Sequence, residues 1–200
     1  MPQVEVERVK VEKDEDVIIN LILENGFRTV AEIGVWEGWM TGRVLNTPAA
    51  NKIIKNYWAI DKWGILEGDE RTAWRDWAKI TQEHWDEKYE KVCMLMRYFQ
   101  SLHVLRRDSL QAAKLFWPGF FDLVYIDACH WYKEVQDDID AWLPLVRKGG
   151  ILAGHDYGPV RDGTGRRSRC EVKPAVDDYF GEGNVTVVPE HMVWYKRVGD

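Results

Sequence analysis

The sequence predicts an α/β fold: a mostly parallel seven-stranded sheet with helices on both faces and an antiparallel strand from a C-terminal hairpin. First, short apolar segments alternate with amphipathic stretches, which is the pattern of strands joined by crossover helices. Second, Phe121–Ile126 is a nearly continuous apolar run, as expected for a central parallel strand. Third, two strand-like segments flank Glu190-His191 and predict a closing hairpin.

The first third of the chain predicts two helices and two strands. Apolar residues at helical spacing indicate a helix over Asp14–Asn25, with Gly26 as its C-cap. A second helix begins at Thr41 and is short because Pro48 interrupts it. The strands predicted for this part are Phe27–Ile33 and Ile53–Ile60.

The rest of the chain continues the alternation with two exceptions. Residues 67–100 are charged and aromatic, and we expect a helical insertion that covers the fold. Residues 157–172 are polar, basic and glycine-containing, which predicts a mobile loop. The remaining predicted strands are His103–Arg106, Ile151–Gly154, Asn184–Pro189 and Met192–Arg197, and the remaining helices are Leu110–Phe116, Trp131–Val146 (ended by Gly149-Gly150) and Pro174–Phe180.

Length and composition favour one globular domain over residues 1–200. The net charge of −6 argues against broad nucleic-acid binding, and no apolar run approaches the ~20 residues of a membrane span. The charged N-terminus has no apolar signal core, so we expect a cytoplasmic protein with a small-molecule substrate. Three cysteines without a CxxC pair argue against a disulfide framework or a zinc site.

Acidic residues end four successive predicted strands. Glu32 ends the first, within VAEIGVWEGWMT, where Gly34 and Gly38 permit a tight turn into a helix. Asp61 ends the second strand, a position at which a carboxylate can accept ribose hydroxyls, and Trp63 lies two residues beyond it. The third and fourth strands are followed by Asp108, Ser109 and Asp127.

In this order the motifs resemble the class I S-adenosylmethionine-dependent methyltransferases, most closely the small branch that includes metal-dependent sugar O-methyltransferases of natural-product pathways. The resemblance covers roughly Val30 to Arg197 and implies a Rossmann-like methyltransferase fold with an antiparallel strand from the terminal hairpin. It further implies where the methyl donor binds: methionine ammonium near Glu32, methionine and ribose along Gly34 and Gly38, ribose hydroxyls on Asp61, and the adenine amino group at Asp108 and Ser109. Trp63 either covers the adenine ring or packs in the core.

Trp36 departs from the acid-x-Gly-x-Gly-x-Gly pattern, because it replaces the middle glycine. The departure is tolerable for S-adenosylmethionine, which carries no pyrophosphate. It counts against a dinucleotide, whose glycine-rich turn needs a close approach to phosphate. A nicotinamide-dependent dehydrogenase is therefore a distant alternative.

A second polar group follows the fourth and fifth strands. Because neighbouring parallel strands end at the same rim, Asp127 and Asp156 can converge on one hard divalent cation such as Mg²⁺ or Mn²⁺. The resemblance implies that these two aspartates bind the metal and that His130 is the general base, a role suited to a pKa near about 6.5. His155 stands where family members often have a further acid, and it is a candidate third ligand that suits Mn²⁺ or Zn²⁺ better than Mg²⁺.

Simpler interpretations stay open for each of these residues. Asp127 can be a strand-end residue near the methyl donor, His130 a cap for the following helix, and Asp156 a brace for the loop after it. The alternative functions are then a metal-independent small-molecule methyltransferase or a catalytically silent cofactor-binding module that acts through an interface.

Two further groups have no specific motif. The first predicts either a lid that recognises a phosphate, carboxylate or acidic sugar, or a solvated loop; it comprises Arg161, Arg166, Arg167 and Arg169. The second either faces a partner or covers the cofactor, and it comprises Trp74, Trp77 and Trp85. With the segment before Asp14, the tryptophan group is where we would expect a homo-oligomer contact.

Overall fold

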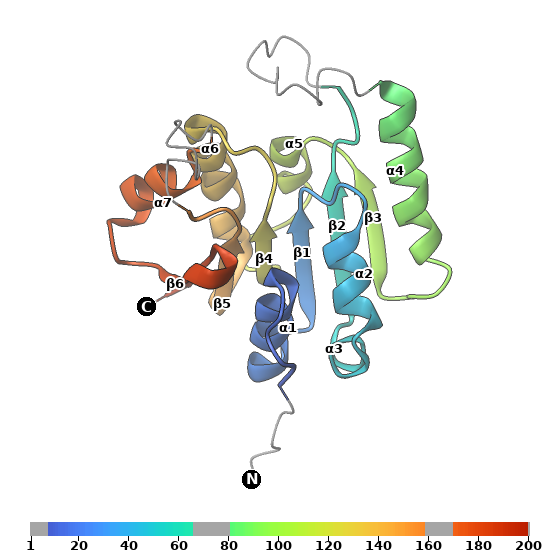
Figure 1. Ribbon diagram of the computed structural model, residues 1–200, viewed down its shortest axis with the longest axis horizontal. Helices are drawn as coiled ribbons and strands as arrows, with labels where there is room; N and C mark the ends of the chain where they lie inside the picture. Colours follow the sequence, from blue (N-terminus) through green and yellow to red (C-terminus); the bar gives the residue numbers. More distant parts are fainter. Residues whose placement is uncertain (1–7, 66–80, 159–169, 200) are drawn as a thin grey trace, which may run out of the picture.

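The predicted strands pair into one sheet in a computed structural model that describes residues 8–65, 81–158 and 170–199. Within these residues seven strands follow the order β3-β2-β1-β4-β5-β7-β6. Strands β1 to β5 pair in parallel, whereas β7 lies antiparallel to both β5 and β6. The strands are β1 (Thr29–Ile33), β2 (Asn56–Asp61), β3 (Leu102–Arg106), β4 (Phe121–Ile126), β5 (Val146–Gly154), β6 (Thr186–Val188) and β7 (Val193–Arg197). The predicted fold class and the terminal hairpin are therefore confirmed (Figure 1).

Helices cover both faces of this sheet (Figure 1). They are α1 (Asp14–Asn25), α2 (Trp39–Asn46), α3 (Pro48–Ile53), α4 (Gln82–Leu95), α5 (Ser109–Ala113), α6 (Tyr132–Trp142) and α7 (Val172–Phe180). Leu123 and Tyr125 of β4 join the apolar cluster of α1, α2 and α3, while Val124 and Ile126 join the cluster of α5, α6 and α7. No helix of the described residues has the length and apolar character needed to cross a bilayer.

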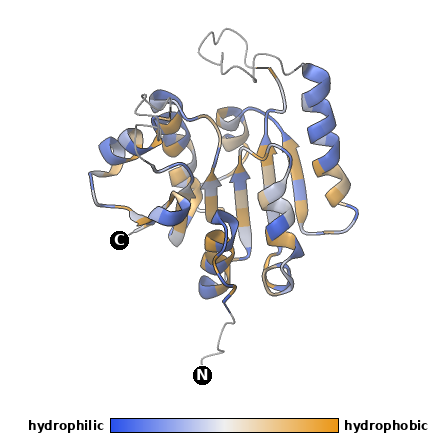
Figure 2. Ribbon diagram, viewed as in Figure 1, coloured by the Kyte–Doolittle hydropathy of each residue, from blue (hydrophilic) through white to orange (hydrophobic). Residues whose placement is uncertain are grey.

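Helix α4 stands beyond β3, at the edge of the sheet (Figure 1). It is largely hydrophilic (Figure 2), and Val92 is its buried residue. Trp85, Tyr89 and Leu95 are partly buried against the α1–α3 side of the core. The helical prediction for residues 67–100 is confirmed for Gln82–Leu95, whereas Trp74 and Trp77 lie outside the described residues.

Pro48 begins a helix, which corrects the prediction that it only interrupts one. Helix α2 ends at Asn46, and Pro48 is the first residue of α3. Proline is well suited to this position because the first backbone N–H of a helix has no intrahelical acceptor. Ile53 therefore belongs to α3, and β2 begins three residues later than predicted, at Asn56.

The long amphipathic helix also ends earlier than predicted. Helix α6 stops at Trp142, and Pro144 lies in a short 3₁₀ turn, Leu143–Leu145, that leads directly into β5. Val146 is thus a strand residue, and Gly149-Gly150 lies inside β5, where the pairing register with β4 shifts between Phe121 and Leu123. The glycine pair accommodates an irregularity in a strand rather than the end of a helix.

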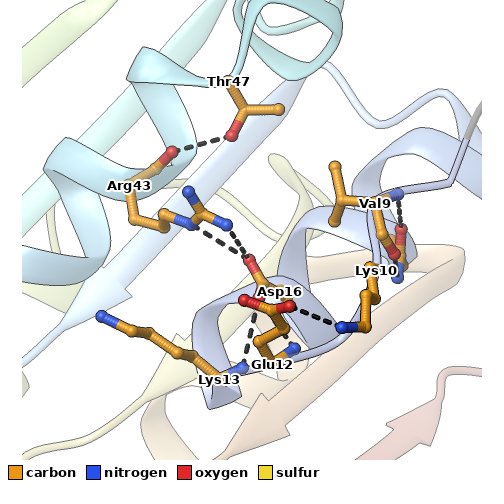
Figure 3. A network of polar contacts seen from close by, with 8 residues as sticks. Val9, Lys10, Glu12, Lys13, Asp16, Arg43 and Thr47 are labelled. Atoms are coloured by element: carbon orange, nitrogen blue, oxygen red, sulfur yellow. Dashed lines mark hydrogen bonds and ion pairs between the residues drawn. The ribbon is translucent and has the colours of Figure 1, made fainter.

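Asp16 fastens α1 to α2 (Figure 3). Its buried carboxylate accepts hydrogen bonds from Arg43 Nε at 3.0 Å and Nη2 at 2.7 Å, and from the backbone N–H groups of Glu12 and Lys13 at 3.0 and 3.1 Å. Burial opposes the charge of Asp16, but these donors outweigh it and lower its pKa. The first turn of α1 is therefore fixed by a satisfied buried charge.

Candidate active site

The turn between β1 and α2 packs closely against the residues that follow β4. At Gly34, with φ +86°, a Cβ atom would lie 2.0 Å from the carbonyl oxygen of Asp127, so no side chain fits. Gly38, with φ +77°, precedes the first residue of α2. The predicted methyl-donor turn and Asp127 are consequently immediate neighbours.

Trp36 adopts the left-handed conformation, with φ +52°, although it is not glycine. Its backbone N–H donates to Asp61, its carbonyl accepts from Trp63 Nε1 at 2.8 Å, and its ring lies 5.1 Å from that of Trp85. The Lys88 ammonium lies 4.1 Å from the centroid of the Trp36 ring. These contacts offset a backbone cost on the order of 1 kcal/mol and explain how a tryptophan occupies the middle-glycine position.

Asp61 organises the same turn. Its Oδ2 accepts from the backbone N–H groups of Val35 at 2.9 Å and Trp36 at 3.0 Å, and its Oδ1 accepts from that of Trp63 at 2.7 Å. The carboxylate therefore holds the glycine turn and the loop after β2 together. Its contact with ribose stays a prediction.

Glu32 turns into the core. Its Oε2 accepts hydrogen bonds from Thr41 Oγ1 at 2.6 Å and from the Tyr57 hydroxyl at 2.7 Å. Burial raises the pKa of Glu32 to about 8, although both hydrogen bonds favour the charged form. Its predicted contact with the methionine ammonium is not tested by this arrangement.

The residues predicted near adenine are engaged with the protein. Trp63 is fully buried, as the core-packing alternative expects, and its contact with adenine stays a prediction. Asp108 caps α5 by accepting from the Gln111 N–H at 3.2 Å. The Ser109 hydroxyl donates to Asp138 at 2.5 Å and accepts from Trp142 Nε1 at 2.8 Å.

A cavity of about 620 Å³ opens beside the ends of β2 and β3. Among the residues predicted to contact the nucleoside, only Trp63 lines it. The described residues around it are Lys62, Trp63, Gly64, Ile65, Gln82, Asp86 and Arg106. The cavity is thus bordered by the start of α4, which the sequence predicted as part of a cover.

The structure brings the predicted catalytic group together. The Asp127 N–H donates to Ile33 O at 2.8 Å and the His155 N–H to Ile126 O at 3.1 Å, so the residues after β4 and β5 are held at one rim. His130 Nε2 lies 3.0 Å from Asp156 Oδ2 and 3.8 Å from Asp127 Oδ1. One potential ligand atom from each of these three side chains lies within 4.8 Å of the other two.

The carboxylates of this group favour the charged forms of its two histidines, whereas His155 disfavours a charge on His130. Burial opposes a charge on His130, but the Asp127 contact and the charges of Asp156 and Asp127 outweigh it and raise the pKa of His130. Burial likewise opposes a charge on His155, but Asp156, Asp127 and Asp14 together raise its pKa to about 9. Burial disfavours the charged form of Asp156 as well, yet the two histidines lower its pKa.

The structure bears on two of the simpler interpretations: it does not show His130 as a helix cap, and it shows Asp156 bracing the following loop through its backbone carbonyl rather than its side chain. The N-cap of α6 is Trp131, and the Tyr132 N–H donates to Glu171 Oε2 at 2.9 Å, so the His130 side chain does not cap the helix. Asp156 has φ +57°, and its side chain faces the two histidines while its backbone carbonyl accepts the loop contacts from Gly158 and Cys170. A left-handed aspartate held toward imidazoles is the kind of local strain found at functional sites.

Two residues of this region were not predicted from the sequence. Asp14, the first residue of α1, lies 3.5 Å from His155 Nε2. Tyr125 is buried, and its hydroxyl has no hydrogen-bond partner among the described residues. A tyrosine inside the apolar run of β4 was the only available signal, because burial of a hydroxyl requires a partner or a polar site nearby. The arginine group at residues 161–169 lies outside the described residues.

More than half of the chain matches the model of a known protein family. The model of a family described as "Methyltransferase domain" matches residues 31–157, which include the glycine turn, Asp127, His130 and Asp156. The chain belongs to this methyltransferase domain family. An uncharacterised protein of Sinorhizobium fredii, y4gI, is 23% identical over 130 residues, which make up 64% of this chain but only 13% of that much longer protein.

Solved methyltransferases share the fold at low sequence identity. An O-methyltransferase from Bacillus cereus in complex with S-adenosylhomocysteine superimposes with a TM-score of 0.58 at 16% identity, covering 94% of this chain and 82% of that one. TomG from Streptomyces achromogenes, in complex with S-adenosylmethionine, has a TM-score of 0.59 at 12% identity and coverages of 98% and 83%. CalS11, a TDP-rhamnose 3'-O-methyltransferase of calicheamicin biosynthesis, has a TM-score of 0.52 at 15% identity and coverages of 92% and 78%. This chain therefore has the fold of S-adenosylmethionine-dependent O-methyltransferases.

Proposed function

We propose that this methyltransferase transfers the methyl group of S-adenosylmethionine to a hydroxyl of a small acceptor, such as a sugar or glycoside, with help from a divalent cation. The observation that carries the proposal is the convergence of Asp127, His130 and Asp156 within 4.8 Å, directly beside the glycine turn. A base at this place can reach a hydroxyl that lies in line with a methyl donor held by the turn.

The residues fit both groups. A side chain at Gly34 would clash with the Asp127 carbonyl, so the glycine brings the predicted methyl-donor turn directly beside Asp127. The Asp127 and Asp156 carboxylates are ligands that Mg²⁺ and Mn²⁺ prefer. The Tyr125 hydroxyl, two residues before Asp127, is buried without a hydrogen-bond partner among the described residues, and a polar group bound near Asp127 would supply one.

In this mechanism each residue has one task. Asp127 and Asp156 would hold the cation, which lowers the pKa of a bound substrate hydroxyl. His130 takes the hydroxyl proton, the acceptor oxygen forms a bond to the methyl carbon, and the sulfur–methyl bond breaks to leave S-adenosylhomocysteine. The remaining acceleration comes from alignment of the two substrates.

The test is His130→Ala, with His84→Ala as a control in an exposed position of α4. We expect turnover of an acceptor found by screening sugars and glycosides to fall by about 10²–10⁴-fold. Affinity for S-adenosylhomocysteine, measured by calorimetry, should stay within about threefold of wild type because His130 is no part of the turn. Full activity of His130→Ala would eliminate His130 as the base.

One observation favours a second candidate, metal-independent methylation. His130 Nε2 already lies 3.0 Å from Asp156 Oδ2, a pairing in which an aspartate can orient a base without any cation. Turnover after chelation separates the two mechanisms. Loss of turnover that Mg²⁺ or Mn²⁺ restores supports the metal-assisted reaction, and undiminished turnover supports the metal-independent one.

A further inference from the structure

His155 and Asp14 extend the cluster of Asp127, His130 and Asp156 toward the start of α1. We propose that His155 is a third metal ligand through Nδ1, that Asp14 orients it, and that the centre therefore selects Mn²⁺ over Mg²⁺. The inference rests on the proposed metal-assisted function and deepens it by giving His155 and Asp14 roles at the same centre.

The two ring nitrogens of His155 face different partners. Nδ1 lies 3.4 Å from Asp156 Oδ2 and 4.0 Å from Asp127 Oδ1, whereas Nε2 lies 3.5 Å from Asp14 Oδ2. A histidine that binds a metal usually donates its other N–H group to a carboxylate, which fixes the ring and its tautomer. The Asp14–His155 pair has this arrangement: Nε2 faces Asp14, and Nδ1 faces the two proposed metal ligands, Asp127 and Asp156.

Burial separates the tasks of the two histidines. The side chain of His155 is 18% exposed, and that of His130 is 43% exposed. The more exposed His130 can meet a substrate hydroxyl, as a base must. The inner His155 lies between carboxylates, as suits a ligand rather than a group that exchanges protons with the acceptor.

Asp14 is held in place independently of any metal. It begins α1, whose first turn is fastened to α2 through Asp16 and Arg43 (Figure 3). The backbone that carries Asp14 is therefore held by the ion pair between the buried Asp16 and Arg43, two residues away from Asp14 along α1. This contact joins the N-terminal helix to residues 141 positions later in the chain.

The buried Tyr125 hydroxyl is a second observation near this place, because Tyr125 lies two residues before Asp127 in β4. The hydroxyl has no hydrogen-bond partner within the described residues. A buried hydroxyl needs a partner, and a hydrated cation held by Asp127 would supply one.

A nitrogen ligand changes the metal preference. Mg²⁺ is bound almost exclusively by oxygen, whereas first-row transition ions also accept imidazole. Two carboxylates with one imidazole therefore favour Mn²⁺ over Mg²⁺, although two carboxylates alone would not make this distinction.

The experiment combines metal titration with pulsed electron paramagnetic resonance of bound Mn²⁺. Wild type should bind Mn²⁺ at least about tenfold more tightly than Mg²⁺ and show coupling of Mn²⁺ to an imidazole nitrogen. His155→Gln should lose this coupling and at least about tenfold of Mn²⁺ affinity, while Mg²⁺ affinity changes by less than about threefold. Asp14→Asn should keep the coupling but weaken Mn²⁺ binding by about tenfold.

The matched control is His130→Gln, which should keep both the nitrogen coupling and the Mn²⁺ affinity. Coupling that disappears in His130→Gln, or is absent from wild type with Mn²⁺ bound, overturns the inference without requiring that His155→Gln folds. Wild-type Mn²⁺ affinity in folded His155→Gln overturns it as well. If wild type binds S-adenosylhomocysteine but neither metal, the metal-assisted function itself fails, which is a distinct result.

Discussion

Along the carboxyl edge of the sheet, acidic residues after β1 to β3 accept hydrogen bonds from the protein, whereas those after β4 and β5 face histidines. Asp61 accepts three backbone N–H groups, and Glu32 accepts two hydroxyl groups. Asp127 and Asp156 instead lie 3.0–4.0 Å from imidazole nitrogens of His130 and His155. The same residue type at equivalent strand ends thus serves two different purposes.

Acids at the ends of β1 to β3 therefore contribute mainly to stability, and we expect those after β4 and β5 to contribute mainly to activity. A carboxylate that satisfies backbone donors stabilises the turn around it, because each donor would otherwise be left unpaired. Aspartates that converge on one another gain less from the fold, and they supply a site for a cation or a proton. Substitutions at the two sets should therefore affect different measurements.

Asp61→Ala should have the largest effect on stability. It leaves the N–H groups of Val35, Trp36 and Trp63 without their acceptor, and we expect the free energy of unfolding to fall by roughly 3–5 kcal/mol. Urea unfolding followed by circular dichroism measures this change.

Asp108→Ala is the matched control for Asp61→Ala, since Asp108 is also a strand-end acid but accepts a single N–H group, from Gln111. Loss of this cap should cost about 1 kcal/mol. Equal losses of unfolding free energy in the two variants would show that the three hydrogen bonds to Asp61 add no more stability than the single bond to Asp108. The assignment of Asp61 to the stabilising acids would then be wrong.

Asp138→Asn should change how stability depends on pH. Burial raises the pKa of Asp138 to about 7, and nearby charges, of which Asp108 is the largest, add to this against the hydrogen bond from Ser109. The folded protein keeps the proton that the unfolded chain releases above pH of about 4, so the stabilisation is complete below that pH and is lost as pH rises through about 7. Wild type should lose roughly 3–4 kcal/mol over this range that Asp138→Asn does not lose.

The control for Asp138→Asn is Asp137→Asn, one residue earlier, where the carboxylate pairs with Lys133 at the surface. Its curve of unfolding free energy against pH should keep most of the wild-type slope, because burial, and not the charge of Asp137, is the largest cause of the raised pKa of Asp138. A wild-type slope that survives in Asp138→Asn would assign the pH dependence to another buried acid, and Glu32 would be the first to examine.

Much of the rim could be predicted because it follows from local pattern. The apolar run of β4 and the glycines after β1 each identify a strand end, and parallel strands must then bring Asp127 and Asp156 together. The errors also had local causes. Pro48 can start a helix as well as end one, and the sequence pattern does not distinguish these uses. The helix predicted over Trp131–Val146 ran past Pro144, a residue that does not fit a helix interior, because the apolar spacing alone was followed.

The partners of the site residues could not be predicted. Glu32 meets Thr41 and Tyr57 because α2 and β2 pack beside β1, and Trp63 is buried because its indole reaches Trp36. These contacts depend on tertiary packing, and no residue spacing in the chain encodes them. Parts of the predicted cover (67–100) and of the predicted loop (157–172), namely residues 67–80 and 159–169, lie outside the described residues and remain predictions.

Asp127→Asn gives the smallest expected change in stability and the sharpest contrast with Asp61→Ala. Its side-chain contacts to His130 and His155 are long, at 3.8 and 4.0 Å, and its backbone N–H still donates to Ile33. In chelator, we expect the free energy of unfolding to stay within about 0.5 kcal/mol of wild type. Metal affinity should fall by at least about tenfold, because a charged ligand is lost. If Asp127→Asn were instead as destabilising as Asp61→Ala, both sets of acids would be structural, and the distinction between the two halves of the rim would be wrong.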